Sequence, residues 1–276
     1  MSDFLAGMVA ASRRRVRSAK ARIGEAELLR RASMRPAPKS LRHHASGFDV
    51  FAEFKPRSPS LGQMLAKGSR DASESGAAYA SGGACAVSVV TEPTAFSGSL
   101  EALTDISGQC GLPTMRKDFL VEPYQVVEAG AHGASGVLLI ARLLDAALLA
   151  EMIATAESMK LFVLVEAFDL DDLDRAVGAL DDAGGAGLLG VNARDLATLA
   201  IDRSRHASLA RHAPAGLRLV AESGIATRKD AARVARLGYS VALVGAALMR
   251  ADDPVPLLSK MIASGRDAAA QREVAR

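Results

Sequence analysis

The sequence predicts an α/β protein, a (β/α)8 TIM barrel with an extra N-terminal helical segment. The first observation is length, because 276 residues suit one such barrel of about 250 residues. The second is an alternating pattern along the chain, in which short apolar runs of strand length are followed by longer stretches with helical periodicity. The runs lack a clean apolar–polar alternation, which is typical of strands buried on both faces. They span residues 48–54, 84–90, 112–115, 135–141, 161–167, 187–192, 217–223 and 241–245.

The chain divides into an appended segment, a barrel and a tail. Residues 1–33 have a helical pattern, and two prolines within residues 34–44 indicate a linker. We therefore expect an N-terminal helical extension and linker over residues 1–45. The barrel catalytic domain is expected over residues 46–265, and a polar C-terminal tail over residues 266–276.

Two of the stretches between the apolar runs carry clear helix signals. Residues 145–159 have a helical apolar pattern, and so do residues 227–238. The second stretch opens with Thr227 and Asp230 at the spacing of a capping box, and it closes at Gly238, a typical C-terminal stop. Helices between the strands are what a barrel requires.

Composition and charge exclude several classes of partner. The 34 Lys and Arg nearly balance 31 Asp and Glu, and the net charge of +3 is too small to indicate a nucleic-acid-binding protein. Aromatic residues make up 4% with no Trp, so no stacking platform for nucleic acid is expected. The basic stretch 13–22 is interpreted as a solvated helix face, with an anionic ligand as the alternative.

The same features predict a cytoplasmic protein. No run of about 18 apolar residues is present, so no membrane span is expected. Charge follows the apolar part of the first residues, the reverse of a secretion signal. Cys85 and Cys110 are too few for a disulfide framework and suit a reducing compartment. We expect a monomer or weak homodimer with no membrane or nucleic-acid partner.

Polar and ionisable residues collect at the ends of the predicted strands, where the active site of a barrel lies. Side chains two apart on a strand share a face, so Glu53 and Lys55 can both point into the mouth. Several charged groups in one cavity would shift each other's pKa values. Such shifts allow one group to act as an acid and another as a base. The candidates at the strand ends are Glu53, Lys55, Lys117, Glu166, Asn192, Glu222 and Ser223.

Glycine turns after the seventh and eighth runs predict a phosphate site. Gly224 follows the seventh run, and Gly245 with Ala246 follows the eighth. Barrels commonly bind phosphate with backbone N–H groups of these two loops, and glycine allows a close approach of the backbone. Ser58 and Arg194 could add a hydroxyl and a guanidinium. A small phosphorylated substrate is the expected partner.

No cofactor or metal is expected. Residues 185–190 match the G-x-G-x-x-G spacing, but they run into a strand instead of following one, so the dinucleotide interpretation fails. The five His lie away from the predicted strand ends and show no ligand spacing with Cys or carboxylates. They are His43, His44, His132, His206 and His212.

Several stretches occur in the order and spacing of one known family and together span the barrel. They are AEFKPRSPSLG (52–62), SVVTEPTAFSGSLEAL (88–103), RKDFLVEPYQVVEAGAHGASGVLLIARLL (116–144), LVEAFDLDDLDRA (164–176), LLGVNARDL (188–196), AESGI (221–225) and LVGAALMRADDP (243–254). On these residues the chain resembles indole-3-glycerol phosphate synthase of tryptophan biosynthesis. The combination of E-x-K-x-x-SPS, RKDF and V-N-x-R-D-L is specific.

The resemblance implies a barrel with a helical segment over its mouth and a reaction that needs no cofactor. In that reaction 1-(2-carboxyphenylamino)-1-deoxyribulose 5-phosphate closes to an indole and releases carbon dioxide and water. Lys117 occupies the family's general-acid position, and Lys55 matches a second lysine that contacts substrate and is an alternative acid. Glu166 matches the general base, and Glu53 pairs with the lysines.

The remaining site residues are also implied by the resemblance. Asn192, Glu222 and Ser223 match polar positions around the intermediate. Phe96 and Phe119 match the apolar positions that hold the anthranilate ring. The implied phosphate-binding residues are Ser58, Arg194, Gly224, Gly245 and Ala246.

The chain departs from the family pattern at several positions. Ala167 and Phe168 replace Val-His, Ala193 replaces the second Asn of Asn-Asn-Arg, and Ala246 replaces a frequent Ser. Pro56 biases the preceding lysine toward an extended backbone. These departures leave open a paralogue that acts on a modified anthranilate.

Two other hypotheses remain beside the synthase. A related barrel, phosphoribosylanthranilate isomerase, would use a Cys or Asp pair, but no Cys ends a strand with a suitable partner. A non-catalytic phosphate-binding barrel is the third, and the complete set of acid and base residues argues against it.

Overall fold

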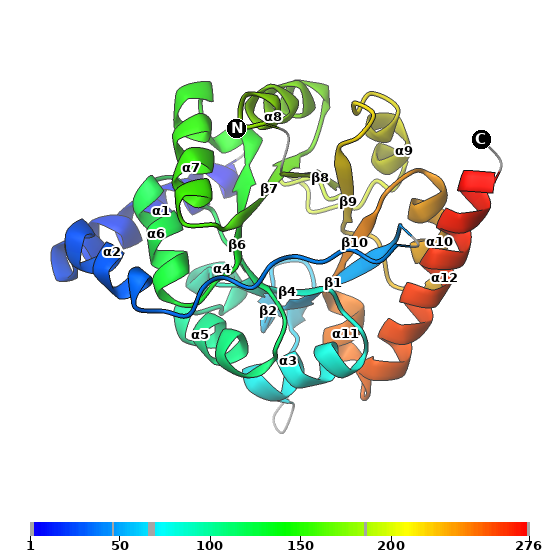
Figure 1. The fold of residues 1–276 in the computed structure, drawn as a ribbon, viewed down its shortest axis with the longest axis horizontal. Helices are drawn as coiled ribbons and strands as arrows, with labels where there is room; N and C mark the ends of the chain where they lie inside the picture. Colours follow the sequence, from blue (N-terminus) through cyan, green and yellow to red (C-terminus); the bar gives the residue numbers. More distant parts are fainter. Residues whose placement is uncertain (1–2, 46, 66–69, 185–186, 275–276) are drawn as a thin grey trace.

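A computed structural model of the chain describes residues 3–45, 47–65, 70–184 and 187–274 and confirms the predicted barrel. Eight parallel strands close into a ring in the order β1-β10-β9-β8-β7-β6-β5-β4 (Figure 1). The strands are β1 Asp49–Phe54, β4 Ala86–Val90, β5 Thr114–Lys117, β6 Gly136–Ile140, β7 Phe162–Ala167, β8 Leu188–Asn192, β9 Arg218–Glu222 and β10 Val241–Val244.

Helices follow the strands and surround the barrel. After the first strand a short hairpin, β2 Arg57–Ser58 and β3 Gly62–Gln63, precedes the first of them. Outside the barrel lie α3 Ala72–Ser81, α5 Leu100–Gln109, α6 Pro123–Ala131, α7 Ala146–Ser158, α8 Leu170–Asp182, α9 Ser204–Ala210, α10 Arg228–Arg236 and α12 Pro254–Val274. Shorter turns of helix are α4 Pro93–Phe96, η1 Ala141–Leu143 and α11 Ala246–Arg250.

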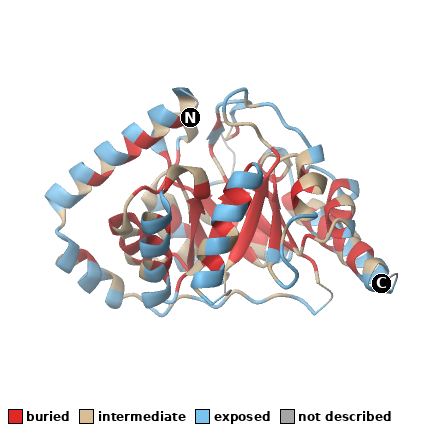
Figure 2. Cartoon of the chain, turned by 90° about the horizontal axis from the view of Figure 1, so that it is seen from above, coloured by how far each residue is buried: buried red, intermediate tan, exposed pale blue. Residues whose placement is uncertain are grey.

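Side chains fill both faces of the strands, as the unalternating apolar runs predicted. One set points into the barrel and forms its interior, which includes Phe51, Met115 and Leu164. The other set, including Val50 and Val163, packs under the outer helices in a larger cluster. Figure 2 shows the strands buried at the centre and exposed residues on the outer sides of the surrounding helices. The charged residues of the strand ends therefore stand on a rigid, closely packed base.

The predicted helix signals are present. Helix α7 begins after Asp145, whose side chain accepts a hydrogen bond from the Leu148 N–H group. The capping box of α10 forms between Thr227 and Asp230, and Gly238 has a φ of 104° just beyond the end of that helix. Only glycine adopts this conformation without strain, so it stops the helix.

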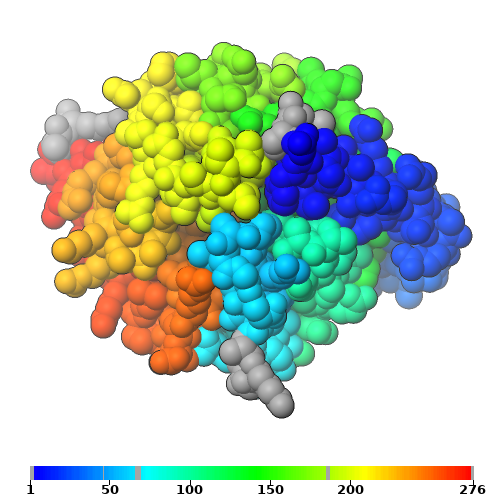
Figure 3. Space-filling model, turned by 180° about the vertical axis from the view of Figure 1, so that it is seen from behind, coloured from blue at the N-terminus to red at the C-terminus, as the bar shows by residue number. Residues whose placement is uncertain are grey.

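The N-terminal segment is helical but not continuous. It breaks near Gly24 into α1 Asp3–Arg22 and α2 Glu25–Ser33. The start of α1 lies beside the segments that follow β1 and β8, at one face of the barrel (Figure 3). From the expected basic face, Arg15 forms ion pairs with Glu92 and Asp118. The stretch is thus not solvated throughout.

The bounds of two segments differ from those that the sequence predicted. The third strand begins two residues later than residues 112–115 implied, so Lys117 is its last residue and does not follow it. The polar tail expected over residues 266–276 continues helix α12 as far as Val274, because Ala268 and Ala269 are buried against the barrel. The first two residues of the glycine stretch 185–190 lie outside the described residues.

Within the described ranges, no helix is both long and apolar enough to cross a bilayer.

Candidate active site

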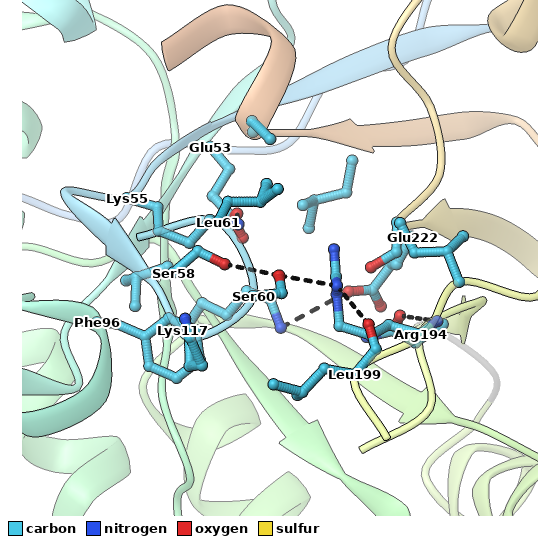
Figure 4. Close-up of a pocket in the computed structure, with 18 of the residues that line it drawn as sticks. Glu53, Lys55, Ser58, Ser60, Leu61, Phe96, Lys117, Arg194, Leu199 and Glu222 are labelled. Atoms are coloured by element: carbon cyan, nitrogen blue, oxygen red, sulfur yellow. Dashed lines mark hydrogen bonds and ion pairs between the residues drawn. The ribbon is translucent and has the colours of Figure 1, made fainter. Parts of the chain in front are cut away.

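A cavity of about 370 Å³ opens at the carboxyl ends of the strands. It lies between the β1 side, with Glu53 and Lys55, and the opposite side, with Arg194 and Glu222 (Figure 4). All of the residues that we predicted for the site line it. They are Glu53, Lys55, Ser58, Phe96, Lys117, Phe119, Glu166, Asn192, Arg194, Glu222, Ser223, Gly224, Gly245 and Ala246.

Lys117 stands at the centre of the charged group. Its Nζ atom lies 3.6 Å from Oε1 of Glu166 and 3.7 Å from Oε2 of Glu222. Asn192 donates a 2.5 Å hydrogen bond from Nδ2 to the same Glu166 oxygen, and its Oδ1 accepts from the Arg194 N–H group at 2.9 Å. Three strands, β5, β7 and β9, thus bring one ammonium group and two carboxyl groups to one point, and β8 holds one of the carboxyls in place.

Burial and mutual repulsion set the protonation states of this group. Burial lowers the pKa of Lys117, but Glu166, Glu222 and Glu53 raise it by more, so its net pKa lies above the ordinary 10.5. The lysine is therefore a protonated acid at neutral pH. Burial and the neighbouring Glu166 raise the pKa of Glu222 well above the ordinary 4.5, although Lys117 acts in the opposite direction.

A second ion pair lies at the carboxyl end of the first strand. Lys55 Nζ bonds to Oε1 of the buried Glu53, as the shared face of the two side chains predicted. A Cβ atom at Gly245 would lie 2.5 Å from the same oxygen. The glycine at the end of β10 therefore leaves the space in which the Glu53 carboxyl lies.

The opposite wall presents backbone groups and the guanidinium of Arg194. Ser223 and Gly224 both adopt left-handed conformations, with φ values of 64° and 72°, and so form a tight turn after β9. Arg194 donates to Ser60 Oγ at 3.0 Å and to the Leu199 carbonyl at 2.8 Å, which links the segments after β1 and β8 (Figure 4). Burial lowers the pKa of this guanidinium, and Glu53 opposes the shift.

Aromatic side chains form the apolar wall. The rings of Phe96 and Phe119 lie 6.2 Å apart, and the ring of Phe4 meets Phe119 edge-on at 6.3 Å. Phe4 also lines the cavity, although sequence reasoning did not place it there. Its only signals were its apolar position at the start of the N-terminal helix and the helical segment that the resemblance implies over the barrel mouth, and neither indicates which residue of the helix enters the cavity.

The prediction that every His lies away from the strand ends is wrong for His206. Its side chain is fully buried, and Nε2 lies 3.1 Å from the carbonyl oxygen of Glu222, the last residue of β9. Burial lowers the pKa of His206 to about 4, so the ring is neutral at physiological pH. Helix α9 brings this residue behind the strand end, a tertiary contact without a local signal.

Within the described residues, no three His, Cys, Asp or Glu side chains group as metal ligands would.

A parallel barrel with buried acids and bases at its carboxyl end defines a class: a (β/α)8-barrel enzyme. A family model described as indole-3-glycerol phosphate synthase matches residues 5–260. The chain belongs to this family, and it is therefore an enzyme of the carboxy-lyase class.

Similar proteins carry the same name. Indole-3-glycerol phosphate synthase of Mycolicibacterium gilvum is 39% identical over 87% of this chain and 86% of its own. That of Desulfosudis oleivorans is 37% identical over 95% of this chain and 99% of its own. Indole-3-glycerol phosphate synthase 1 of Streptomyces coelicolor is 40% identical, with 89% of each chain covered. Among solved structures, a 3-hexulose-6-phosphate synthase gives a TM-score of 0.60 at 17% identity, covering 79% of this chain and 99% of that chain, and shares the fold.

Proposed function

We propose that the protein converts 1-(2-carboxyphenylamino)-1-deoxyribulose 5-phosphate to indole-3-glycerol phosphate in tryptophan biosynthesis. One observation carries this proposal: a partly buried, protonated lysine lies between two buried carboxyl groups, with aromatic rings on one side of the cavity and glycine turns on the other. The substrate has an aromatic ring at one end and a phosphate at the other, which suits these two walls.

Ring closure needs an acid, and Lys117 is placed to supply it. The aromatic carbon attacks the ribulose carbonyl while the lysine protonates the carbonyl oxygen. Because the charge that develops there is neutralised in a site with little water, the lysine acts mainly on the transition state. Loss of carbon dioxide then restores the aromatic ring. Lys55 is the alternative acid, and its ion pair with Glu53 keeps both groups at the mouth.

Dehydration needs both a base and an acid. Glu166 is the proposed base, and Asn192 orients its carboxyl. Glu222 and Ser223 surround the intermediate. Phe96 and Phe119 hold the anthranilate ring, and the substrate phosphate binds Ser58, Arg194, Gly224, Gly245 and Ala246.

The alternative of a modified anthranilate depends on the departures from the family pattern. Among the cavity-lining residues, only Ala246 belongs to the departures, because Ala167, Phe168 and Ala193 do not line the cavity. Phe168 packs under Arg142, whose guanidinium carbon lies 4.5 Å from the ring centre. Because Ala167, Phe168 and Ala193 do not line the cavity, these departures favour the unmodified substrate over one with a modified anthranilate ring. A monomer or weak homodimer in the cytoplasm stays a prediction, which sedimentation and cell fractionation would test.

A fluorescence assay for the indole product tests the proposal. The purified protein is mixed with the carboxyphenylamino-deoxyribulose phosphate, with and without a chelator. We expect rapid product formation in both. Tight binding without product would favour a different ring preference, and no binding would refute the proposed function.

A further inference from the structure

Gly190, in the middle of β8, stands between the strands that carry the two carboxyl groups. It pairs with Glu166 of β7 in the strand register, and two residues later Asn192 pairs with Glu222 of β9. A Cβ atom at Gly190 would overlap Oε1 of Glu222, and would also lie 3.2 Å from Leu164. The Glu222 carboxyl thus occupies the space that any other residue's side chain would take.

The carboxyl held in this space has few partners. Neither oxygen of Glu222 accepts a hydrogen bond from a described donor, although its side chain is only 1% exposed. The charged groups that face it are Glu166, Lys117 and Glu53. Glu53 is already paired with Lys55, so the single charge of Lys117 serves both remaining carboxyls.

With both carboxyls ionised, Glu166 and Glu222 together would carry one negative charge more than Lys117 neutralises. One bound proton removes this excess charge. The Glu166 and Glu222 carboxyls are close neighbours, because they lie 3.6 and 3.7 Å from the same Lys117 Nζ atom, and Glu166 raises the pKa of Glu222. Two ionised carboxylates at that separation would repel each other, whereas a carboxyl and a carboxylate that share a proton attract. A buried charge without a partner is costly, so the shared proton is the stable arrangement.

We propose that Gly190 is a positioning residue, which lets the Glu222 carboxyl lie against Glu166 so that the pair holds one proton before substrate binds. This inference rests on the proposed function. In dehydration the C–O bond breaks as the hydroxyl takes the shared proton and leaves as water. The C–H bond of the adjacent ring carbon breaks, its electron pair forms the new double bond, and its proton returns to the pair.

The first experiment compares the pH dependence of kcat/KM for the wild type, Gly190→Ala and Gly136→Ala. Gly136 is a matched control, because a Cβ atom there would lie 2.5 Å from Phe162 in the apolar end of the barrel, away from the carboxyls. We expect Gly190→Ala to lower kcat about 100-fold, the size of one acid–base contribution, with KM changed less than about threefold. The alkaline limb of its kcat/KM profile should move to lower pH, because Glu222 is pushed from Glu166.

Gly136→Ala should leave the shape of the profile unchanged, whatever strain it introduces. An unchanged profile for Gly190→Ala, or an equal shift for Gly136→Ala, would refute the positioning role.

A double-mutant cycle covers the case in which Gly190→Ala alone does not fold. Glu222→Ala vacates the space that the new methyl group needs, so the double variant should fold. If Gly190 acts through Glu222, adding Gly190→Ala to Glu222→Ala should lower kcat less than about twofold further. A full additional loss would show that Gly190 acts independently and would overturn the proposal.

A measurement without substrate separates this inference from the proposed function. Infrared spectra of the unliganded protein would follow the protonated-carboxyl band as pH rises. We expect a band in the wild type that persists well above the ordinary range of Glu, and that is lost in Glu222→Gln. If the wild type shows this band but no indole product, the proposed function fails and the shared proton stands. If the band is missing while product forms, the shared proton fails.

Discussion

Two charged networks begin from consecutive residues of the chain and differ in how fully their groups are hydrogen-bonded. Arg116 and Asp118 belong to a network between β5 and the outer elements, whereas Lys117 belongs to the charged group inside the cavity, which Asp118 also lines. The alternation of side chains along a strand sends neighbours to opposite faces. Arg116 and Asp118 therefore contribute to a stabilising network, while Lys117 between them contributes to the reactive group.

The outer network is fully hydrogen-bonded. Arg116 donates to Thr91 at 3.1 Å, to the Gln125 carbonyl at 2.9 Å and to Glu128 at 2.8 Å. Asp118 accepts from Thr91 and from its neighbour's N–H group, and Arg15 of α1 completes it at 2.7 Å. Such a network fixes the strand end and the N-terminal helix in one arrangement.

The inner group is only partly satisfied. Lys117 reaches its carboxyls at 3.6 and 3.7 Å, beyond a good hydrogen bond, and the oxygens of Glu222 accept none from a described donor. Its members therefore keep unused hydrogen-bonding capacity for a substrate. In this protein the network whose hydrogen-bonding groups all have partners stabilises the fold. The group whose hydrogen-bonding capacity is only partly used is the reactive one.

The largest expected effect comes from breaking the inner group. Lys117→Met should lower kcat about 10³–10⁴-fold, since the acid is lost, with KM changed less than about threefold. The exposed Lys229→Met serves as control. Steady-state kinetics with the indole assay gives the answer. Near-normal turnover would transfer the acid role to Lys55.

Breaking the outer network should affect stability instead. Arg116→Met leaves Glu128 without its cation and the Thr91 hydroxyl and Gln125 carbonyl without their donor, while Asp118 keeps Arg15, so it should lower the free energy of unfolding by about 3 kcal/mol. Urea unfolding measures this, with the exposed Arg236→Met as control. The kcat of the folded fraction should stay within about threefold of the wild type. A stability loss below about 1 kcal/mol would contradict the structural role.

The pH dependence of stability sharpens the comparison. A carboxyl whose pKa is raised by folding stabilises the folded state at low pH, and this contribution is lost as pH rises through the folded pKa. Burial and Glu166 raise the pKa of Glu222 above 4.5, so the wild type should lose stability relative to Glu222→Gln above that pH. The slope is at most about 1.4 kcal/mol per pH unit.

Urea unfolding at about pH 5 and about pH 8 measures this difference. The exposed Glu157→Gln should show no such trend. A stability gap between the wild type and Glu222→Gln that does not change with pH would contradict the raised pKa.

The smallest effect is expected where the outer network meets α1. Arg15 is partly exposed, so Arg15→Ala should cost only about 1 kcal/mol of stability. Because α1 places Phe4 against Phe119, we also expect KM to rise about threefold with kcat little changed. Arg14→Ala, exposed on the same helix, is the matched control. Equal KM values for both variants would show that docking of α1 does not shape the cavity.

Most of the site was predictable because it lies at strand ends. Glu166 was predicted at the end of its strand, and it lies there above Phe162 and Leu164, which have the same parity on β7 and belong to the barrel interior. The positions of Phe4 in the cavity and of His206 behind the end of β9 were not predictable, because each residue belongs to a helix. A helical pattern states which face is apolar but not which partner it meets.

The sequence by itself determined the order of strands and helices, the closed parallel barrel and the strand ends at which charges gather. Local periodicity and capping are properties of neighbouring residues, so they can be found in one dimension. Only the tertiary structure decided that Lys117 faces two carboxyls, that Gly190 and Gly245 leave space for Glu222 and Glu53, and that α1 closes one wall. These contacts join strands far apart in the chain, and their distances follow from closure of the barrel and packing of its interior.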